Sequence, residues 1–423
     1  MAGVKRLSPL AAVVVLTASS LALADTTITL SGNVPADGLD HFFLPFTVPA
    51  NTAEIEIAHD DQSAENILDW GVYDQAGNRG WGGGNSENVV INANAASRSY
   101  VPGPITAGEW KVVVGKARIV NLPGTYKIVI TFRDVATLPP QTRTPYVAVP
   151  AIKKGPAWYA GDFHAHSRES GDAKPTLDEM VQTAKTKGLD FVEISDHNVV
   201  TQLDYFASAS TQGILLVPGI ELTTYAGHAN AIGATAWVDH KIGQPGVTID
   251  AAADQIHAQG GLFSINHPTL DLGDLCIGCA WKHTLGSDKI DAVEIATGGW
   301  KQSGLLFSPS AQAKWDAICA TGRHIGAIGG SDDHTAGQST GQRDSAIGSP
   351  TTMIYADELS VAGLIAGIKK GRTVVKLQES TDPMVELLAN QVSGTDAMIG
   401  DVVSARGTTL RALVKGGAVG NVV

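Results

Sequence analysis

Nine histidine, aspartate and glutamate side chains lie in short polar strings whose order and spacing suit a cluster of metal ions. The strings include FHAH, SDHN, GIEL, GHAN, INHP and GSDDH, and most of them follow a run of apolar residues. Neutral imidazole and carboxylate are natural ligands of zinc, manganese or iron, and no cysteine belongs to the set. The pattern predicts a centre of two or three divalent metal ions. Its expected ligands are His164, His166, Asp172, His197, Glu221, His228, His267, Asp332 and His334.

One such residue alone would be explained better as a buried histidine with a satisfied hydrogen bond, or as an aspartate in a turn. That account does not suit nine residues distributed over six strand ends. The other histidines of this region have no histidine or carboxylate at chelating spacing, and we expect them to be structural. They are His240, His257, His283 and His324.

Strand-like and helix-like segments alternate from residue 158 to residue 380, which predicts an α/β fold. Thr176 and Glu179 form a capping box at the start of one helix, and Gly188 ends it. Further helices are expected at about 248–259, 309–321 and 358–370. Strands are expected at Phe191–Ile194, Ile214–Val217, Ala229–Gly233, Leu262–Ile265, Ala292–Ile295, His324–Ile328, Thr351–Tyr355 and Thr373–Lys376. This alternation favours a TIM-like parallel barrel, whose strand ends deliver side chains to one rim.

The flanking segments have a different character. Residues 25–134 contain short alternating strands separated by Gly, Asn, Pro and Asp, which predicts a small all-β sandwich or jelly roll. Residues 135–157 form a proline-rich linker, and residues 381–423 a short β-rich tail. In the β domain, Asp60, Asp61, Asp69 and Asp74 are interpreted as a solvated acidic loop, with a calcium site as the alternative. His41 and His59 are interpreted as structural. We expect deletion of this domain to spare most turnover.

Residues 1–24 have the pattern of a secretory signal. Lys5 and Arg6 precede an apolar stretch, and Ala22-Leu23-Ala24 provides a small-residue cleavage site. A membrane anchor is disfavoured because the stretch is short and interrupted by Pro9. No other segment is long and apolar enough to cross a membrane, so we expect a periplasmic or extracellular protein.

The net charge of the chain indicates which kinds of partner it can bind. The formal net charge is −12, and no run of basic residues is present, which disfavours nucleic-acid binding. We expect a small-molecule substrate, and the sequence leaves the oligomeric state open. Of the three cysteines, Cys276 and Cys279 are interpreted as a local disulfide, with a redox-active pair or a zinc site as alternatives.

The strings FHAHS, SDHN, GIEL, INHP and GSDDH, in that order, resemble the PHP (polymerase and histidinol phosphatase) superfamily. The SDHN and GIELTT forms behind an exported β domain most resemble its carbaryl-hydrolase-like branch. The segment ENILDWGVYDQAGN resembles pre-peptidase C-terminal-like domains. The superfamily resemblance implies a distorted seven-stranded barrel holding three metals. It implies that His164, His166 and Asp332 hold the first metal, that Glu221 bridges to a second held by His228 and His267, and that Asp172, His197 and His334 hold a third.

These residues imply hydrolysis by a metal-bridged hydroxide, since metal binding lowers the pKa of water. The leading hypothesis is a phosphoesterase acting on small phosphorylated metabolites or nucleotides, with Arg168 and Lys174 as candidate phosphate contacts. Asp196 and Asn198 are expected to orient ligands. The alternative is a carbamate, ester or amide hydrolase. Its apolar pocket would use Trp237, Trp281, Trp300 and Phe307. A second alternative is a non-catalytic binding protein.

Overall fold

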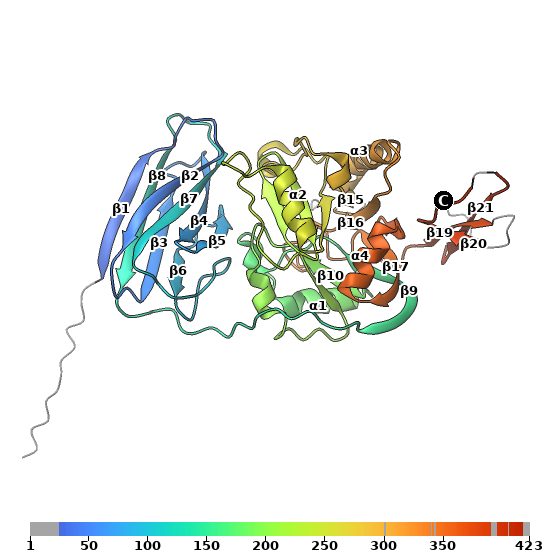
Figure 1. Ribbon diagram of the computed structural model, residues 1–423, viewed down its shortest axis with the longest axis horizontal. Coiled ribbons are helices and arrows are strands. Elements are labelled where there is room, and N and C mark those ends of the chain that lie inside the picture. Colours follow the sequence, from blue (N-terminus) through green and yellow to red (C-terminus); the bar gives the residue numbers. More distant parts are fainter. Residues whose placement is uncertain are drawn as a thin grey trace, which may run out of the picture.

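The computed structural model describes residues 25–299, 302–339, 341, 344–390, 396–404 and 406–417. The signal segment and Trp300 lie outside the described residues. Within them, no helix is both long and apolar enough to span a membrane. Three parts follow one another along the longest axis (Figure 1): an N-terminal β domain, a central α/β domain and a small C-terminal sheet.

The N-terminal domain consists of two four-stranded antiparallel sheets, which fits the predicted sandwich. Alternation along the strands places apolar side chains such as Ile128, Ile130 and Trp110 between the sheets, where they are buried. One sheet has the order β1 (Thr26–Asn33), β8 (Thr125–Arg133), β3 (Glu54–Asp60) and β6 (Val89–Asn92). The other has the order β2 (His41–Val48), β7 (Gly108–Arg118), β4 (Ile67–Asp74) and β5 (Gly77–Gly83).

The central domain contains two five-stranded sheets. The first has the order β11 (Leu215–Pro218), β10 (Phe191–Ile194), β9 (Lys153–Asp162), β17 (Thr351–Leu359) and β18 (Thr373–Lys376). The second has the order β12 (Glu221–Thr224), β13 (Gly227–Ile232), β14 (Leu262–Ile265), β15 (Ala292–Thr297) and β16 (Gly326–Gly330). Its helices are α1 (Leu177–Thr186), α2 (Ile249–Ala258), α3 (Gln302–Cys319) and α4 (Val361–Lys369). Short 3-10 turns are η1 (Arg168–Ser170), η2 (Thr201–Tyr205), η3 (Gly273–Leu275) and η4 (Ser287–Lys289).

The predicted TIM-like parallel barrel is not confirmed. β13 runs antiparallel to both β12 and β14, and β17 runs antiparallel to β9. The cause lies in the connections: β12 and β13 are joined by Tyr225 and Ala226 alone, and so short a turn joins only antiparallel strands. Isolated parallel bridges link both outer strands of the second sheet to the first sheet beside the predicted ligands: His197, after β10, pairs with Glu221 of β12, and Ala165, after β9, pairs with Asp333, after β16.

The linker lies against both domains. The Glu54 carboxylate in the β domain accepts hydrogen bonds from the backbone amides of Thr137 and Leu138 at 3.0 and 2.9 Å. Further along, the Arg143 guanidinium lies 3.3 Å from the Asp204 carboxylate of the central domain. The segment predicted as linker also includes the start of β9, which begins at Lys153.

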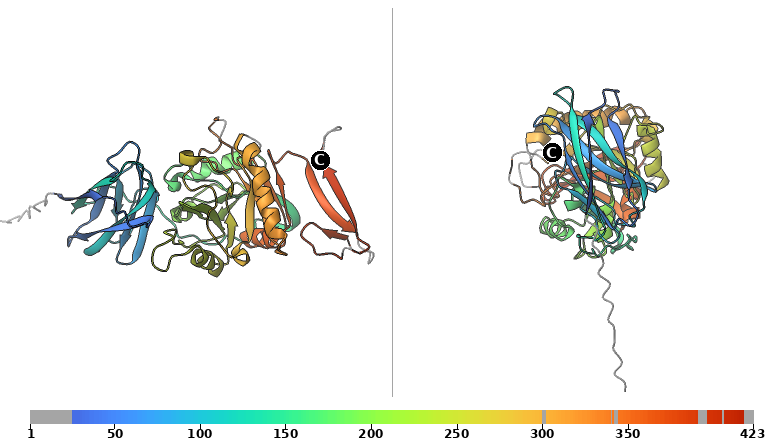
Figure 2. Two further views of the ribbon diagram at one scale, coloured as in Figure 1. Left: turned by 90° about the horizontal axis from the view of Figure 1, so that it is seen from above. Right: turned by 90° about the vertical axis from the view of Figure 1, so that its left-hand side faces the viewer.

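The tail forms a three-stranded antiparallel sheet of β20 (Asp396–Met398), β19 (Met384–Asn390) and β21 (Thr409–Lys415). Figure 2 shows this sheet at the opposite end of the molecule from the N-terminal domain. All residues of β21 are exposed.

Candidate metal centre

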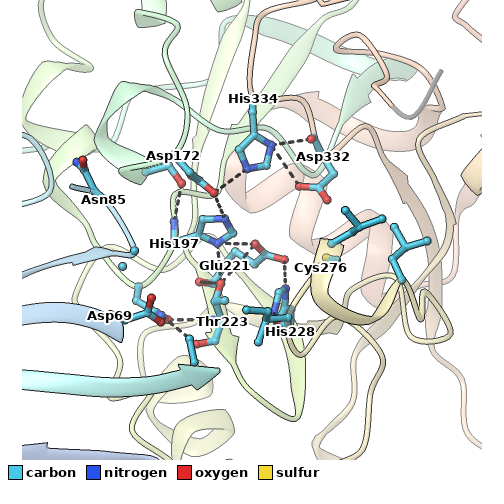
Figure 3. A pocket seen from close by; sticks show the side chains of 18 of the residues that line it. Asp69, Asn85, Asp172, His197, Glu221, Thr223, His228, Cys276, Asp332 and His334 are labelled. Atoms are coloured by element: carbon cyan, nitrogen blue, oxygen red, sulfur yellow. Dashed lines mark hydrogen bonds and ion pairs between the residues drawn. The ribbon is translucent and has the colours of Figure 1, made fainter. Parts of the chain in front are cut away.

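All nine predicted ligands meet on the face of the central domain that is turned toward the β domain. They are supplied by the ends and edges of strands from both sheets. His164 and His166 follow β9, Asp172 lies in the next loop, and His197 follows β10; Glu221 and His228 lie in β12 and β13, His267 follows β14, and Asp332 and His334 follow β16. Figure 3 shows six of them: Asp172, His197, Glu221, His228, Asp332 and His334.

Glu221 lies at the centre of the cluster and is fully buried. Its two carboxylate oxygens face different imidazoles, as a bridging ligand would require. Oε1 lies 3.2 Å from His164 Nε2, 3.2 Å from His267 Nε2 and 3.3 Å from His228 Nδ1, while Oε2 lies 2.8 Å from His197 Nδ1 and 3.7 Å from His166 Nε2. Burial acts to raise the pKa of Glu221, but the surrounding imidazoles outweigh it and lower the pKa well below the usual range.

Asp332 completes a four-residue group with His164, His166 and Glu221, whose ligand atoms all lie within 4.8 Å of one another. The Asp332 Oδ1 atom is 3.1 Å from His166 Nε2 and 3.3 Å from His164 Nε2. His164 Nε2 is buried and makes no hydrogen bond in the described part of the chain, although it faces two carboxylates. An orphaned imidazole nitrogen aimed at carboxylates fits a divalent cation.

Asp172 joins the cluster on its open side. Its Oδ2 atom lies 3.3 Å from His197 Nε2 and 3.4 Å from His334 Nε2, and its side chain is 56 % exposed. Desolvation of the carboxyl by the surrounding cluster acts to raise the pKa of Asp172, yet the His197 and His334 imidazoles outweigh it and lower this pKa well below its usual range. The ligand atoms of His166, His197 and His334 lie within 4.8 Å of one another, so His166 is within reach of two groups.

The loop closed by Cys276 and Cys279 fixes the orientation of two ligands. The predicted disulfide joins these cysteines. His228 Nε2 donates to the Ile277 carbonyl at 3.3 Å, and His267 Nδ1 donates to the Cys279 carbonyl at 3.2 Å. A carbonyl can only accept, so His228 Nδ1 and His267 Nε2, the nitrogens that face Glu221, are left with free lone pairs for a cation.

Sequence reasoning missed Glu294. This buried residue of β15 has its Oε2 atom 3.1 Å from His164 Nδ1 and accepts a 3.1 Å hydrogen bond from the His267 backbone amide. It therefore holds one ligand by its ring and another by its backbone. The sequence feature that could have revealed Glu294 is its place inside an apolar strand, because a buried acid there needs polar partners.

Asp196 and Asn198 were predicted to orient ligands, and both contact the segments that carry them. The buried Asp196 carboxylate accepts hydrogen bonds from the Ser167 amide and hydroxyl at 2.6 and 2.5 Å, next to His166. Asn198 exchanges two 2.9 Å hydrogen bonds with the backbone of Thr223. It adopts φ of 56°, a left-handed conformation that asparagine tolerates.

Arg168 and Lys174, predicted to contact phosphate, are not among the described residues that line the ligand cavity. Both are exposed, and Arg168 lines a smaller cavity beside η1 instead. Trp237, Trp281 and Phe307, predicted for an apolar pocket, do not line it either. The Trp237 indole donates to the Asn198 carbonyl at 3.1 Å, and Trp281 packs on Phe263.

The cavity over the ligands measures about 810 Å³, and both domains line it. The β domain contributes Ile67, Asp69, Trp81 and the run 82–86, which lie opposite His197, Glu221 and Asp332. The interpretation of Asp69 as part of a solvated acidic loop is therefore wrong, since Asp69 lies in β4 and lines the cavity. The sequence pattern around Asp69 does not distinguish the two environments, because a strand residue that faces solvent alternates with apolar residues in the same way. The expectation that deletion of the β domain spares most turnover stays a prediction.

Residues 162–270 match the PHP domain family. No curated protein matches. One similar solved structure is a two-domain protein from Bacteroides vulgatus containing a predicted PHP-like metal-dependent phosphoesterase. The two sequences are 19% identical, the alignment covers 65% of this chain and 90% of the other, and the TM-score is 0.39. Another is an amidohydrolase from Chromobacterium violaceum with bound sulfate, with 17% identity, 42% and 88% coverage, and a TM-score of 0.28. Likenesses this distant do not fix an activity.

Proposed function

We propose that this protein is a metal-dependent hydrolase of phosphoesters, acting on a small phosphorylated metabolite or nucleotide. The observation that supports the proposal is the convergence of nine predicted ligand side chains, with Glu221 at their centre, beneath a cavity of about 810 Å³ and in a region that overlaps the PHP domain match. Three divalent cations would carry six positive charges, whereas the carboxylates of Asp172, Glu221 and Asp332 contribute three negative charges. The excess would attract an anion into an acidic protein.

Two or three zinc, manganese or iron ions would be held by the residues described above. Bound there, such ions would polarise the ester oxygen and activate water. The chain's own contribution is positional. Glu221 and Asp332 hold the imidazoles apart from one another, while Glu294 and the Cys276–Cys279 loop fix their tautomers. The cavity above admits the substrate on the side where Asp172 and His334 are partly exposed.

The first experiment measures metal stoichiometry and phosphoester turnover for the wild type, Glu221→Ala and His166→Ala. We expect the wild type to hold two or three ions and to hydrolyse members of a phosphoester panel. Glu221→Ala should lose ions from more than one position and reduce turnover by about three powers of ten or more. Full metal occupancy with near-normal turnover in Glu221→Ala would refute the site, and a metal-loaded wild type that ignores the panel would refute the phosphoesterase.

Hydrolysis of a carbamate, ester or amide is the second candidate, in keeping with the carbaryl-hydrolase-like resemblance. The observation that favours it is an apolar side of the cavity formed by Leu270, Leu272, Leu275 and Ile277. An aryl N-methylcarbamate compared with the corresponding aryl phosphate separates the two activities. Fewer than two ions per chain under metal-replete conditions would instead favour a non-catalytic binding protein.

The pre-peptidase-like assignment of the β domain and export of the chain remain part of the proposal. Export rests on the charged start, apolar stretch and small-residue cleavage site of residues 1–24. Recovery of a chain beginning at Asp25 from the periplasm or medium would support export. A protein found in the cytoplasm that still begins at Met1 would refute it.

A further inference from the structure

Two hydrogen-bonding groups of the β domain face the metal-ligand cluster across the cavity. Asp69 comes from β4, and Asn85 from the turn after β5. Figure 3 shows both on one side of the cluster formed by Asp172, His197 and Glu221. Because that cluster would hold the reacting phosphate, a substrate's departing alcohol would extend toward a neighbouring wall of the same cavity.

Asp69 is held in place by the central domain. The Tyr225 hydroxyl donates a 2.6 Å hydrogen bond to Asp69 Oδ2. Tyr225 lies in the turn between β12, which begins with Glu221, and β13, which carries His228. The hydrogen bond from Tyr225 therefore fixes the position of the Asp69 carboxylate relative to these two predicted ligands. The β domain makes room for this contact at Gly115, where a Cβ atom would lie only 2.1 Å from Tyr225 Oη.

The second oxygen of Asp69 remains available. In the described part of the chain Oδ1 accepts no hydrogen bond, and its neighbour is Gly84, whose Cβ position would be 3.4 Å away. In the same wall, Asn85 uses its side-chain oxygen to accept from the Glu87 amide at 2.9 Å, which leaves its amide NH₂ to donate. Ser86 is exposed beside it and adds a hydroxyl. The wall thus offers an anionic acceptor, a neutral donor and a hydroxyl.

Two buried histidines also line the cavity, His41 from the β domain and His240 from the central domain. All four of their ring nitrogens lack a hydrogen-bond partner among the described residues. Burial lowers the pKa of both, so the rings are neutral and each can donate from one nitrogen and accept at the other. Buried polar atoms without partners are rare in proteins, and ordered water or ligand hydroxyls commonly satisfy them.

We propose that the β domain forms the leaving-group subsite, and that the alcohol it receives carries hydroxyl groups, as in a polyol or sugar phosphate, which donate to Asp69 and accept from Asn85. This proposal rests on the phosphoesterase function proposed above. Asp69 acts as a specificity-determining residue, because it contacts the part of the substrate that departs and none of the ligands.

The test compares two phosphonates whose carbon–phosphorus bond cannot be hydrolysed: 3,4-dihydroxybutylphosphonate and butylphosphonate, which lacks the hydroxyls. Calorimetry measures their binding to the metal-loaded full chain. We expect the wild type to prefer the diol by about 10-fold, the order expected for a hydrogen bond to a charged group. Asp69→Asn should reduce that preference to about twofold while butylphosphonate binds as before.

The matched control is Asp60→Asn, an exposed position of the β domain outside the cavity, which should keep the wild-type preference. Metal content and thermal midpoint, measured for each variant, establish that Asp69→Asn is folded and loaded. An unchanged diol preference in Asp69→Asn, or no preference in the wild type, would overturn the subsite while leaving the phosphoesterase intact. If neither phosphonate binds a wild-type protein that retains its metals, the proposed function itself fails.

Discussion

The backbone amide of Ser99 donates a 3.0 Å hydrogen bond to the carboxylate of Glu169, and the Ser99 hydroxyl donates to the Glu169 carbonyl at 2.7 Å. Ser99 belongs to the β domain, whereas Glu169 belongs to the loop that carries Asp172. The Arg98 guanidinium adds a 2.7 Å hydrogen bond to the Ala173 carbonyl. The β domain therefore holds in position the loop that carries the predicted ligand Asp172.

We expect Glu169→Ala to weaken the metal held by Asp172, His197 and His334 by about 10-fold or more, because the loop loses its side-chain tie to Ser99. Metal titration followed by mass spectrometry of the native protein measures the effect. The control is Arg168→Ala, whose side chain is exposed. Equal occupancy of every metal position in the two variants would contradict the prediction.

Glu294→Gln should lower metal affinity by about 10- to 100-fold, a range typical for residues that orient ligands. The change removes the negative charge beside His164 Nδ1, which makes that ring a poorer ligand. Competition with a chelating dye gives the affinity. A half-buried acid that does not line the cavity, as in Glu358→Gln, provides the comparison, and identical affinities for both variants would argue against the role of Glu294.

The Cys276–Cys279 loop should control the metal held by His228 and His267. Replacing both cysteines by serine frees the Ile277 and Cys279 carbonyls that fix the two tautomers. We expect about 10-fold weaker binding of one ion with the others unchanged. Cys319→Ser is the control, since Cys319 is a free thiol in α3. Treatment of the wild type with a dithiol reductant should reproduce the loss; a metal content insensitive to both changes would disprove the coupling.

Acid should destabilise the metal-free protein through His41. Burial, assisted by Lys241 and Lys116, lowers the pKa of His41 from 6.5 to about 3. Between these values the unfolded chain binds a proton that the folded chain refuses, so the free energy of unfolding falls as pH drops from about 6.5 toward 3. His41→Phe should reduce the difference between urea midpoints at pH 7.5 and pH 5.0.

The comparison for this experiment is His324→Gln, which lies outside the cavity and should keep the wild-type pH difference. Chelator is present throughout, because metal binding to the neighbouring ligands would add its own pH dependence. A His41→Phe protein with an undiminished difference would show that His41 does not contribute.

The proximity of the predicted ligands could be predicted from the sequence because the evidence for it is local. An imidazole or carboxylate directly after an apolar strand, as at His197, is placed by the strand itself, and the capping box of Thr176 and Glu179 is present as predicted. Strand directions were less accessible. The turn at Tyr225 and Ala226 reverses the chain between two short strands, and the sequence pattern does not mark residues 221–224 as a strand.

Contacts between the domains could not be predicted, because they depend on which surfaces meet. Asp69 resembles any solvent-facing acid until Tyr225 is placed against it, and Arg168 resembles a phosphate ligand until η1 turns it toward another cavity. Glu294 was accessible in principle, since a glutamate within the apolar strand of β15 requires a partner. Its partner, however, is far away in sequence.

The absence of a side chain at Gly115 leaves the space that Tyr225 occupies, and this limits which β domains could replace the present one by recombination. Any side chain at this position would begin 2.1 Å from the tyrosine hydroxyl and 3.1 Å from Trp81. At Gly171 a Cβ atom would likewise lie 2.7 Å from the Gly82 carbonyl oxygen, across the same boundary. A β domain of other sequence joined at the linker would need glycine at the position of Gly115, or a displaced Tyr225, to pack against this central domain in the same way.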